Sequence, residues 1–257
     1  MPFYDFDYKR KTYLCIVNMT KKAFSHIIAV LMAGMGLLSS CSDQYNILGK
    51  SSVEAYEGSM LYLKSYNMQN TLFSRDSSEV VHGAFSFEGP VDSECVAQLF
   101  MGDVSLMPVV IESGQYTISF NEVERTIHGG TLNGRLYKFL PVQRRLQAEI
   151  EENLQNVARM IMDNREPRAY ELIERKTEVL QDQQEKLWVS FITENIDNVL
   201  GTTYFKEYVS RYDYPLITPQ IGRIIKHAPP KFLNDPDIKV YLQNAEFNMQ
   251  LMRGELP

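Results

Sequence analysis

The chain is poor in cysteine, with three in 257 residues. Cys15 and Cys41 lie in the first 41 residues, so Cys95 is alone in the remaining body and no intramolecular disulfide is possible there. No C-x-x-C pair and no cysteine–histidine spacing of a zinc site occurs, which removes the usual ligands for redox and metal chemistry. A lone cysteine in the apolar segment 95–97 is more often a small buried hydrophobe than a nucleophile.

Basic residues are also few. Residues 1–40 hold five of the 26 lysines and arginines and two of the 32 acidic residues, so the rest of the chain has 21 basic and 30 acidic residues and a formal charge of −9. No basic patch or stripe appears. Because nucleic-acid binding draws on counterion release by clustered lysine and arginine, this composition gives no reason to expect a nucleic-acid partner.

Recognisable catalytic motifs are absent as well. The sequence has no G-x-S-x-G, no H-E-x-x-H and no phosphate-binding glycine loop, and His82, His128 and His227 are scattered. Glu151 and Glu152 are adjacent on an expected helix and point to different sides of it. We therefore assign no catalytic, cofactor-binding or metal-binding residue and expect a non-enzyme more than an enzyme.

What the sequence does have is a leader. From Met19, the basic residues Lys21 and Lys22 precede an apolar stretch over residues 23–38, and Leu38-Ser39-Ser40-Cys41 closes it. This order resembles a bacterial lipoprotein signal peptide. The resemblance implies lipidation at Cys41 through a thioether to diacylglycerol, and two or three acyl chains, palmitate among them, anchor a protein stably in a membrane. Residues 1–18 would then be an upstream start or an extended leader.

The alternative is a membrane-spanning helix. Residues 23–38 would reach about 24 Å, short of a hydrocarbon core of about 30 Å. Ser42 follows the cysteine where aspartate would favour the inner membrane. Ser42-Asp43-Gln44 is similar to short acidic tags of surface lipoproteins of Bacteroidetes. We expect an outer-membrane lipoprotein of the cell envelope, facing either the periplasm or the outside.

The composition predicts an α+β protein with a boundary near Gly129-Gly130: a leader over 1–40, a β domain over 41–130 and a helical region over 131–257. The β domain is expected to be an antiparallel sandwich or barrel-like sheet. Phe85 and Phe87 share one face of a strand and are expected in its core. Glu112-Ser113-Gly114-Gln115 is typical of a hairpin turn. The expected strands cover residues 59–65, 79–82, 84–88, 95–101, 105–112, 115–120 and 123–128.

Apolar residues after position 133 recur at three- and four-residue steps, which predicts a long amphipathic helix. Thr131 or Asn133 can cap this helix, and Pro141 should kink it or divide it. A second long helix is expected over residues 167–199, antiparallel to the first, with Gly201 as its stop. Shorter helices are expected over residues 204–212, 219–226 and 235–252.

Two motifs carry a family resemblance: the strand that ends in Gly83-Ala84-Phe85-Ser86-Phe87-Glu88-Gly89, and His128-Gly129-Gly130-Thr131-Leu132-Asn133 before the first helix. Residues 45–140 resemble the DUF4369 domain of exported Bacteroidetes proteins, with Gly130 as an extra residue. In many relatives this domain and a helical segment precede a thioredoxin-like domain of AhpC/TSA-type thiol-disulfide oxidoreductases. The cysteines of that domain match no position here.

These observations favour a non-catalytic, lipid-anchored module that binds an envelope protein, a peptide or a glycan. Tyr204, Tyr208, Tyr212 and Tyr214 cluster in the sequence and form the candidate partner surface, with helix packing as the alternative. The second hypothesis is an accessory or truncated member of an envelope thiol-disulfide system. It requires Cys95 as a reactive thiol or a separate thioredoxin-like partner.

Overall fold

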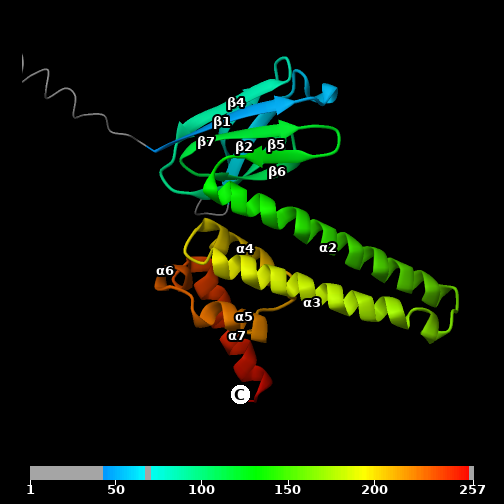
Figure 1. The fold of residues 1–257 in the computed structure, drawn as a ribbon. Helices are drawn as coiled ribbons and strands as arrows, with labels where there is room; N and C mark the ends of the chain where they lie inside the picture. The colour runs from blue at the N-terminus through cyan, green and yellow to red at the C-terminus, as the bar shows by residue number, and fades with distance from the viewer. Residues whose placement is uncertain (1–42, 67–70, 255–257) are drawn as a thin grey trace, which may run out of the picture. The chain divides into compact units, whose positions relative to one another are not determined.

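The computed structural model describes residues 43–66 and 71–254, so Cys41 and the expected leader lie outside the described residues. The described chain begins with eight strands and continues with helices (Figure 1), which confirms the α+β prediction. The strands are β1 (Gln44–Ser51), β2 (Met60–Tyr66), β3 (Leu72–Glu79), β4 (Ala84–Pro90), β5 (Cys95–Met101), β6 (Val104–Ile111), β7 (Gly114–Phe120) and β8 (Arg125–His128).

The strands form two four-stranded sheets, in the orders β4-β1-β7-β8 and β3-β2-β5-β6. All neighbours are antiparallel except β1 and β7, which are parallel. The sheets face each other as a sandwich and do not close into a barrel. Each sheet therefore has two edges, with β4 and β8 at the edges of the first sheet and β3 and β6 at those of the second.

Two strands were not expected from the sequence. In β1 every second residue is buried, among them Tyr45 and Ile47, and the strand lies in the middle of its sheet. β3 is polar and mostly exposed, so it has no alternating pattern to recognise. The expected strand over residues 79–82 is wrong, because the chain turns there with positive φ at His82 (53°) and Gly83 (71°).

The hairpin predicted at Glu112–Gln115 is also wrong. β6 lies in the second sheet and β7 in the first, so this segment carries the chain from one sheet to the other. A hairpin requires the two flanking strands to pair, and β7 pairs with β1 and β8 instead. The crossing leaves Glu112 buried beside the start of the first long helix.

The sandwich interior is one apolar core that contains Phe85 and Phe87, as predicted; Phe85 stacks on Phe120 with 5.4 Å between ring centroids. A second core joins the helices to the outer face of the second sheet through Val110, which is fully buried. Burial of such residues supplies most of the favourable free energy of folding. The β domain and the helices are thus packed on each other through β5 and β6.

The helices are α2 (Thr131–Met162), α3 (Glu171–Glu194), α4 (Val199–Val209), α5 (Pro219–Lys226), α6 (Pro230–Leu233) and α7 (Pro236–Met252), with short 3₁₀ turns at Glu54–Tyr56 and Pro167–Ala169. Pro141 was expected to kink or divide the first helix, but α2 runs through it as one element. Pro141 is exposed, and both flanks of the helix are held by packing, so the loss of one helical hydrogen bond is tolerated.

Gly201 is not a helix stop. The second long helix, α3, ends at Glu194, and Gly201 lies in the first turn of α4, where its N–H donates to the carbonyl of Asn195 at 3.1 Å. A Cβ at position 201 would collide with that carbonyl. Glycine is therefore needed here for a close approach of two backbones and not for a left-handed conformation.

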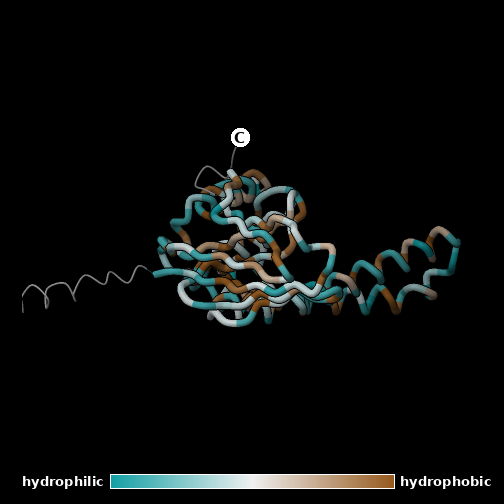
Figure 2. Tube along the Cα trace, turned by 90° about the horizontal axis from the view of Figure 1, so that it is seen from above, coloured by the Kyte–Doolittle hydropathy of each residue, from teal (hydrophilic) through white to brown (hydrophobic). Residues whose placement is uncertain are grey.

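α2 and α3 form the predicted antiparallel hairpin, whose far half projects away from the sheets (Figures 1 and 2). Beyond the body of the protein its core is small: Leu146, Ile150 and Leu180. No helix within the described residues has the length and apolar character needed to cross a membrane.

Candidate functional site

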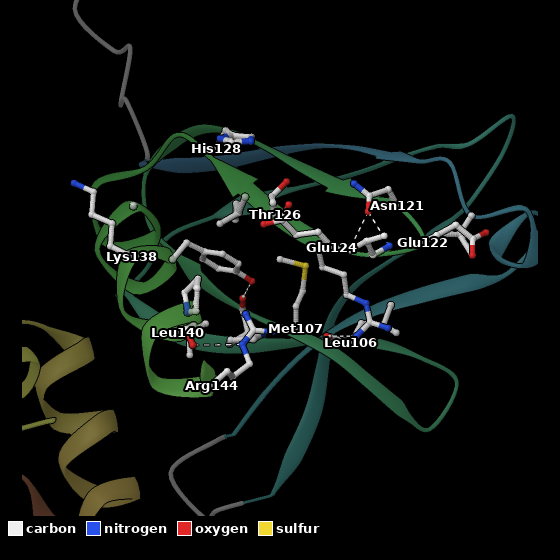
Figure 3. Close-up of a pocket in the computed structure, with 18 of the residues that line it drawn as sticks. Leu106, Met107, Asn121, Glu122, Glu124, Thr126, His128, Lys138, Leu140 and Arg144 are labelled. Atoms are coloured by element: carbon white, nitrogen blue, oxygen red, sulfur yellow. Dashed lines mark hydrogen bonds between the residues drawn. The ribbon is translucent and has the colours of Figure 1, made fainter. Parts of the chain in front are cut away.

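A groove of about 1090 Å³ lies on one side of the sandwich, between the edge strands β6 and β8 and the first turns of α2 (Figure 3). We call it the β6–β8 groove. It is lined by Leu106, Met107 and Pro108 of β6, Asn121–Glu124 of the β7–β8 turn, Arg125–His128 of β8, and Gly134, Tyr137, Lys138, Leu140, Pro141 and Arg144 of α2, together with Val53, Tyr56 and Gly129.

Side chains form hydrogen bonds with the outward-facing backbone groups along the β6 edge. Arg125 donates from Nη1 to the carbonyl of Leu106 at 2.9 Å, and the Tyr137 hydroxyl donates to the carbonyl of Pro108 at 2.9 Å. Pro108 has no N–H to offer. An uncovered edge would be a template for pairing with another chain, so these contacts remove β6 as a docking strand.

Asn133 completes this edge. Its side-chain amide accepts from the N–H of Val110 at 2.9 Å and donates to the carbonyl of Val110 at 2.7 Å, as a paired strand would. Asn133 was a candidate helix cap, and this prediction is wrong, as is that for Thr131. The N-cap is Gly130, and no side chain on α2 caps the helix.

Glu112 performs the capping from the crossing between the sheets. One carboxylate oxygen accepts from the N–H groups of Thr131 (2.8 Å) and Leu132 (3.0 Å), and the other accepts from the backbone and side chain of Asn133. A negative charge is favourable at a helix N-terminus, where the first N–H groups lack partners. Gly130 has φ of 76°, and a Cβ there would overlap Glu112.

The other open side of the sandwich is closed in a similar way. The N–H groups of Ser86 and Glu88 on the β4 edge donate to the side chains of Ser78 (3.1 Å) and Asp76 (3.0 Å) on β3. β3 is itself an edge, but a bulge at Arg75 interrupts its ladder with β2. Such a bulge makes an edge strand a poor template for a further strand.

The outer edge of β8 differs from these edges. The Asn121 N–H donates to the Glu124 carbonyl, and the register then places the N–H and C=O groups of Arg125 and Ile127 away from β7, toward the groove. None of these four backbone groups has a hydrogen-bond partner among residues 43–66 and 71–254. The groove thus presents an unpaired strand edge beside an open volume.

The groove is amphipathic. Figure 3 shows Met107 near its centre and Lys138 pointing away from it, while Glu122 and Glu124 lie at the turn that forms one end. Burial raises the pKa of Tyr137, with Arg144 and Arg125 nearby opposing the shift. The phenol therefore stays protonated at physiological pH and keeps donating to Pro108.

The groove offers hydrogen-bonding, apolar and charged groups to a bound molecule. Its lining contains backbone donors and acceptors, an apolar floor and charged rims, but no hydrogen-bonded pair of nucleophile and base. Among the described residues, no group of three or more histidine, cysteine, aspartate or glutamate side chains could hold a metal ion.

The tyrosines of the predicted partner surface are divided. Tyr204 and Tyr208 are buried in the helical core, and the Tyr208 hydroxyl donates to Glu185. Tyr212 is half-buried and Tyr214 is exposed. The structure therefore does not bring the four rings together on one face, because the helical period of α4 turns the first two inward.

The other residues considered from sequence lie apart. Cys95 is half-buried, and burial raises the pKa of its thiol, with Arg75 opposing the shift. His82, His128 and His227 are all exposed, and of these only His128 lines the groove. Cys41, the predicted lipidation site, lies outside the described residues.

Arg125 and Tyr137, which cover the β6 edge of the groove, were not singled out from the sequence, and Asn133 was considered only as a helix cap. One signal was available, because a proline within an apolar strand predicts an edge strand, and Pro108 is such a residue. Nothing in the pattern indicates which distant side chains reach that edge.

In the comparison with protein-family models, residues 45–136 match the family described as Domain of unknown function (DUF4369). This segment contains the sandwich except for Gln44, and the start of α2 up to Leu136, and it confirms the resemblance expected from the two glycine motifs. The groove therefore straddles the end of the matched segment. No curated protein and no solved structure matches the chain.

Proposed function

We propose that this protein is a lipid-anchored cell-envelope module that binds an extended segment of a partner polypeptide in the β6–β8 groove. The bound segment would add to β8 as a further strand. The observation that carries the proposal is the row of unpaired backbone groups at Arg125 and Ile127 beside an open groove. Strand addition uses such an edge for affinity and neighbouring side-chain pockets for specificity.

The anchoring half of the proposal is supported by Leu38-Ser39-Ser40-Cys41 behind the apolar leader. We expect the membrane-bound protein to begin at an acylated Cys41, which mass spectrometry of the N-terminal peptide would detect. Cys41→Ser should move the protein out of the outer-membrane fraction, whereas Cys95→Ser should leave it there. An unmodified Cys41 in membrane-derived protein would contradict this half.

Thiol-disulfide chemistry is the less favoured alternative. It would place the reaction at Cys95, whose thiol is half-buried and whose pKa is raised by that burial. Reactive cysteines are instead exposed and have lowered pKa values. The geometry therefore favours binding.

Gly134 allows the groove to be blocked with little structural cost. It is helical, and a Cβ built there meets no atom within 4 Å, which is also true of Gly222 on α5. Gly134→Tyr should fill the groove, and Gly222→Tyr is the matched control outside it. We expect extended peptides selected from a random displayed library against the full chain to bind the Gly222→Tyr variant normally and the Gly134→Tyr variant weakly or not at all.

Amide hydrogen exchange gives the sharper test of the binding mode. A strand added to β8 should slow exchange at Arg125 and Ile127, whose N–H groups point outward. Thr126 and His128 should change little because their N–H groups already pair with β7. Peptides that bind equally well to both glycine variants, or protection without this alternation, would overturn strand addition in the groove.

A further inference from the structure

The strand directions define the end of the sandwich at which β1 begins, three residues after Cys41 in the sequence. β1 begins at Gln44, where it pairs with Pro90 at the end of β4. Five residues after Pro90 the chain enters β5 at Cys95, and β2 runs antiparallel to β5, so β2 ends and β3 begins at this same end. We call it the tether end.

Three large apolar side chains are exposed at the tether end. Tyr66 is 62% exposed, and Leu72 and Phe73 are each 38% exposed. Tyr66 and Leu72 are directly opposite each other in the β2–β3 ladder, so they share a face. Phe73, the next residue, is opposite Ser65 and points to the other face of the sheet at the same end. The Arg75 guanidinium lies 5.4 Å from the centroid of the Phe73 ring.

The short stretch of chain between Cys41 and β1 indicates a lipid bilayer as the partner of this surface. Three Cα steps join Cys41 to Gln44 and span at most about 11 Å. A lipid on Cys41 would hold the tether end against the bilayer. Val81, Val104 and Val123 are also exposed, but they lie at the opposite end, about 25 Å away along a strand of eight residues.

We propose that Tyr66, Leu72 and Phe73 rest in the bilayer interface and fix the tilt of the body on the membrane. The inference rests on the proposed lipidation of Cys41. Aromatic side chains suit this position because one part of the ring is apolar and the other tolerates water. Asp43, Asp92 and Glu94 are exposed at the same end, so the surface fits a zwitterionic bilayer better than an anionic one.

Tryptophan quenching by brominated lipids tests the contact. The chain has one tryptophan, Trp188, which is buried. Tyr66→Trp and the matched control Val123→Trp would be made in the full-length lipidated protein, with Trp188→Phe. Both variants would be reconstituted into phosphatidylethanolamine–phosphatidylcholine vesicles with brominated chains. If Trp188→Phe fails to fold, the wild-type signal of Trp188 is measured alone and subtracted.

We expect strong quenching at position 66 and none at position 123, and weaker quenching at 66 when anionic lipid is added. Equal quenching at both positions, or quenching at neither, would overturn the inference. Vesicle flotation separates this failure from failure of the anchor. A protein that floats with the vesicles but shows no quenching at position 66 is anchored, and its tether end does not contact the bilayer. A protein that does not float lacks the lipid anchor.

Discussion

At the residue scale, the most informative side chain is Glu112. Sequence reasoning placed it in a hairpin turn, yet it is buried and its two oxygens accept four hydrogen bonds from the start of α2. One residue thereby joins the crossing between the sheets to the first helix. A buried carboxylate is costly unless such donors surround it, so the site is stable only as a complete set.

Replacing this carboxylate tests that view. In Glu112→Gln one oxygen becomes an NH₂ group that faces the N–H donors of α2, and the helix N-terminus loses its negative charge. We expect the free energy of unfolding to fall by about 1–3 kcal/mol, measured by urea denaturation. Glu124→Gln, at an exposed turn, should change stability by less than about 0.5 kcal/mol. Equal stability of the two variants would contradict a capping role for Glu112.

At the element scale, patterns with a clear period were predicted well. β5 and α5 have the expected bounds, and the antiparallel pairing of α2 and α3 was predicted from the apolar stripe. Elements whose local sequence pattern is weak or conflicting were predicted poorly. β3 was missed because it is polar, and α2 continues through Pro141 because contacts on both sides outweigh one lost hydrogen bond.

The projecting part of the α2–α3 hairpin should be the less stable part of these helices. Its core contains only Leu146, Ile150 and Leu180, and two helices of this kind depend on their mutual packing. We expect Leu180→Ala to cost about 2–3 kcal/mol locally and to speed amide exchange over residues 150–180. The amide of Ile118, in the sandwich, should not change.

Leu172→Ala is the control, since Leu172 is on the same helix and 74% exposed. It should leave exchange in the hairpin unchanged. If Leu180→Ala alters the sandwich as much as the hairpin, the two parts unfold together and the hairpin is not a separate unit of stability.

At the scale of the whole molecule, three of the four sheet edges are protected from pairing with a further strand, each in a different way. Side chains of α2 and β8 cover β6, side chains of β3 cover β4, and β3 carries a bulge. β8 alone combines an unpaired outer edge with a groove within the described residues. The groove exists because α2 leaves the sandwich beside β8 instead of covering it.

Local patterns in the sequence were enough to predict the class of the fold, the long helical hairpin and the family resemblance that the match over residues 45–136 confirms. These follow from local period and from glycines that particular turns require. The groove depends on contacts between segments that lie far apart in the chain. Arg125, Asn133 and Tyr137 reach a strand that lies 19 to 29 residues away in the chain. No local pattern encodes such contacts, because they depend on which sheet each strand joins.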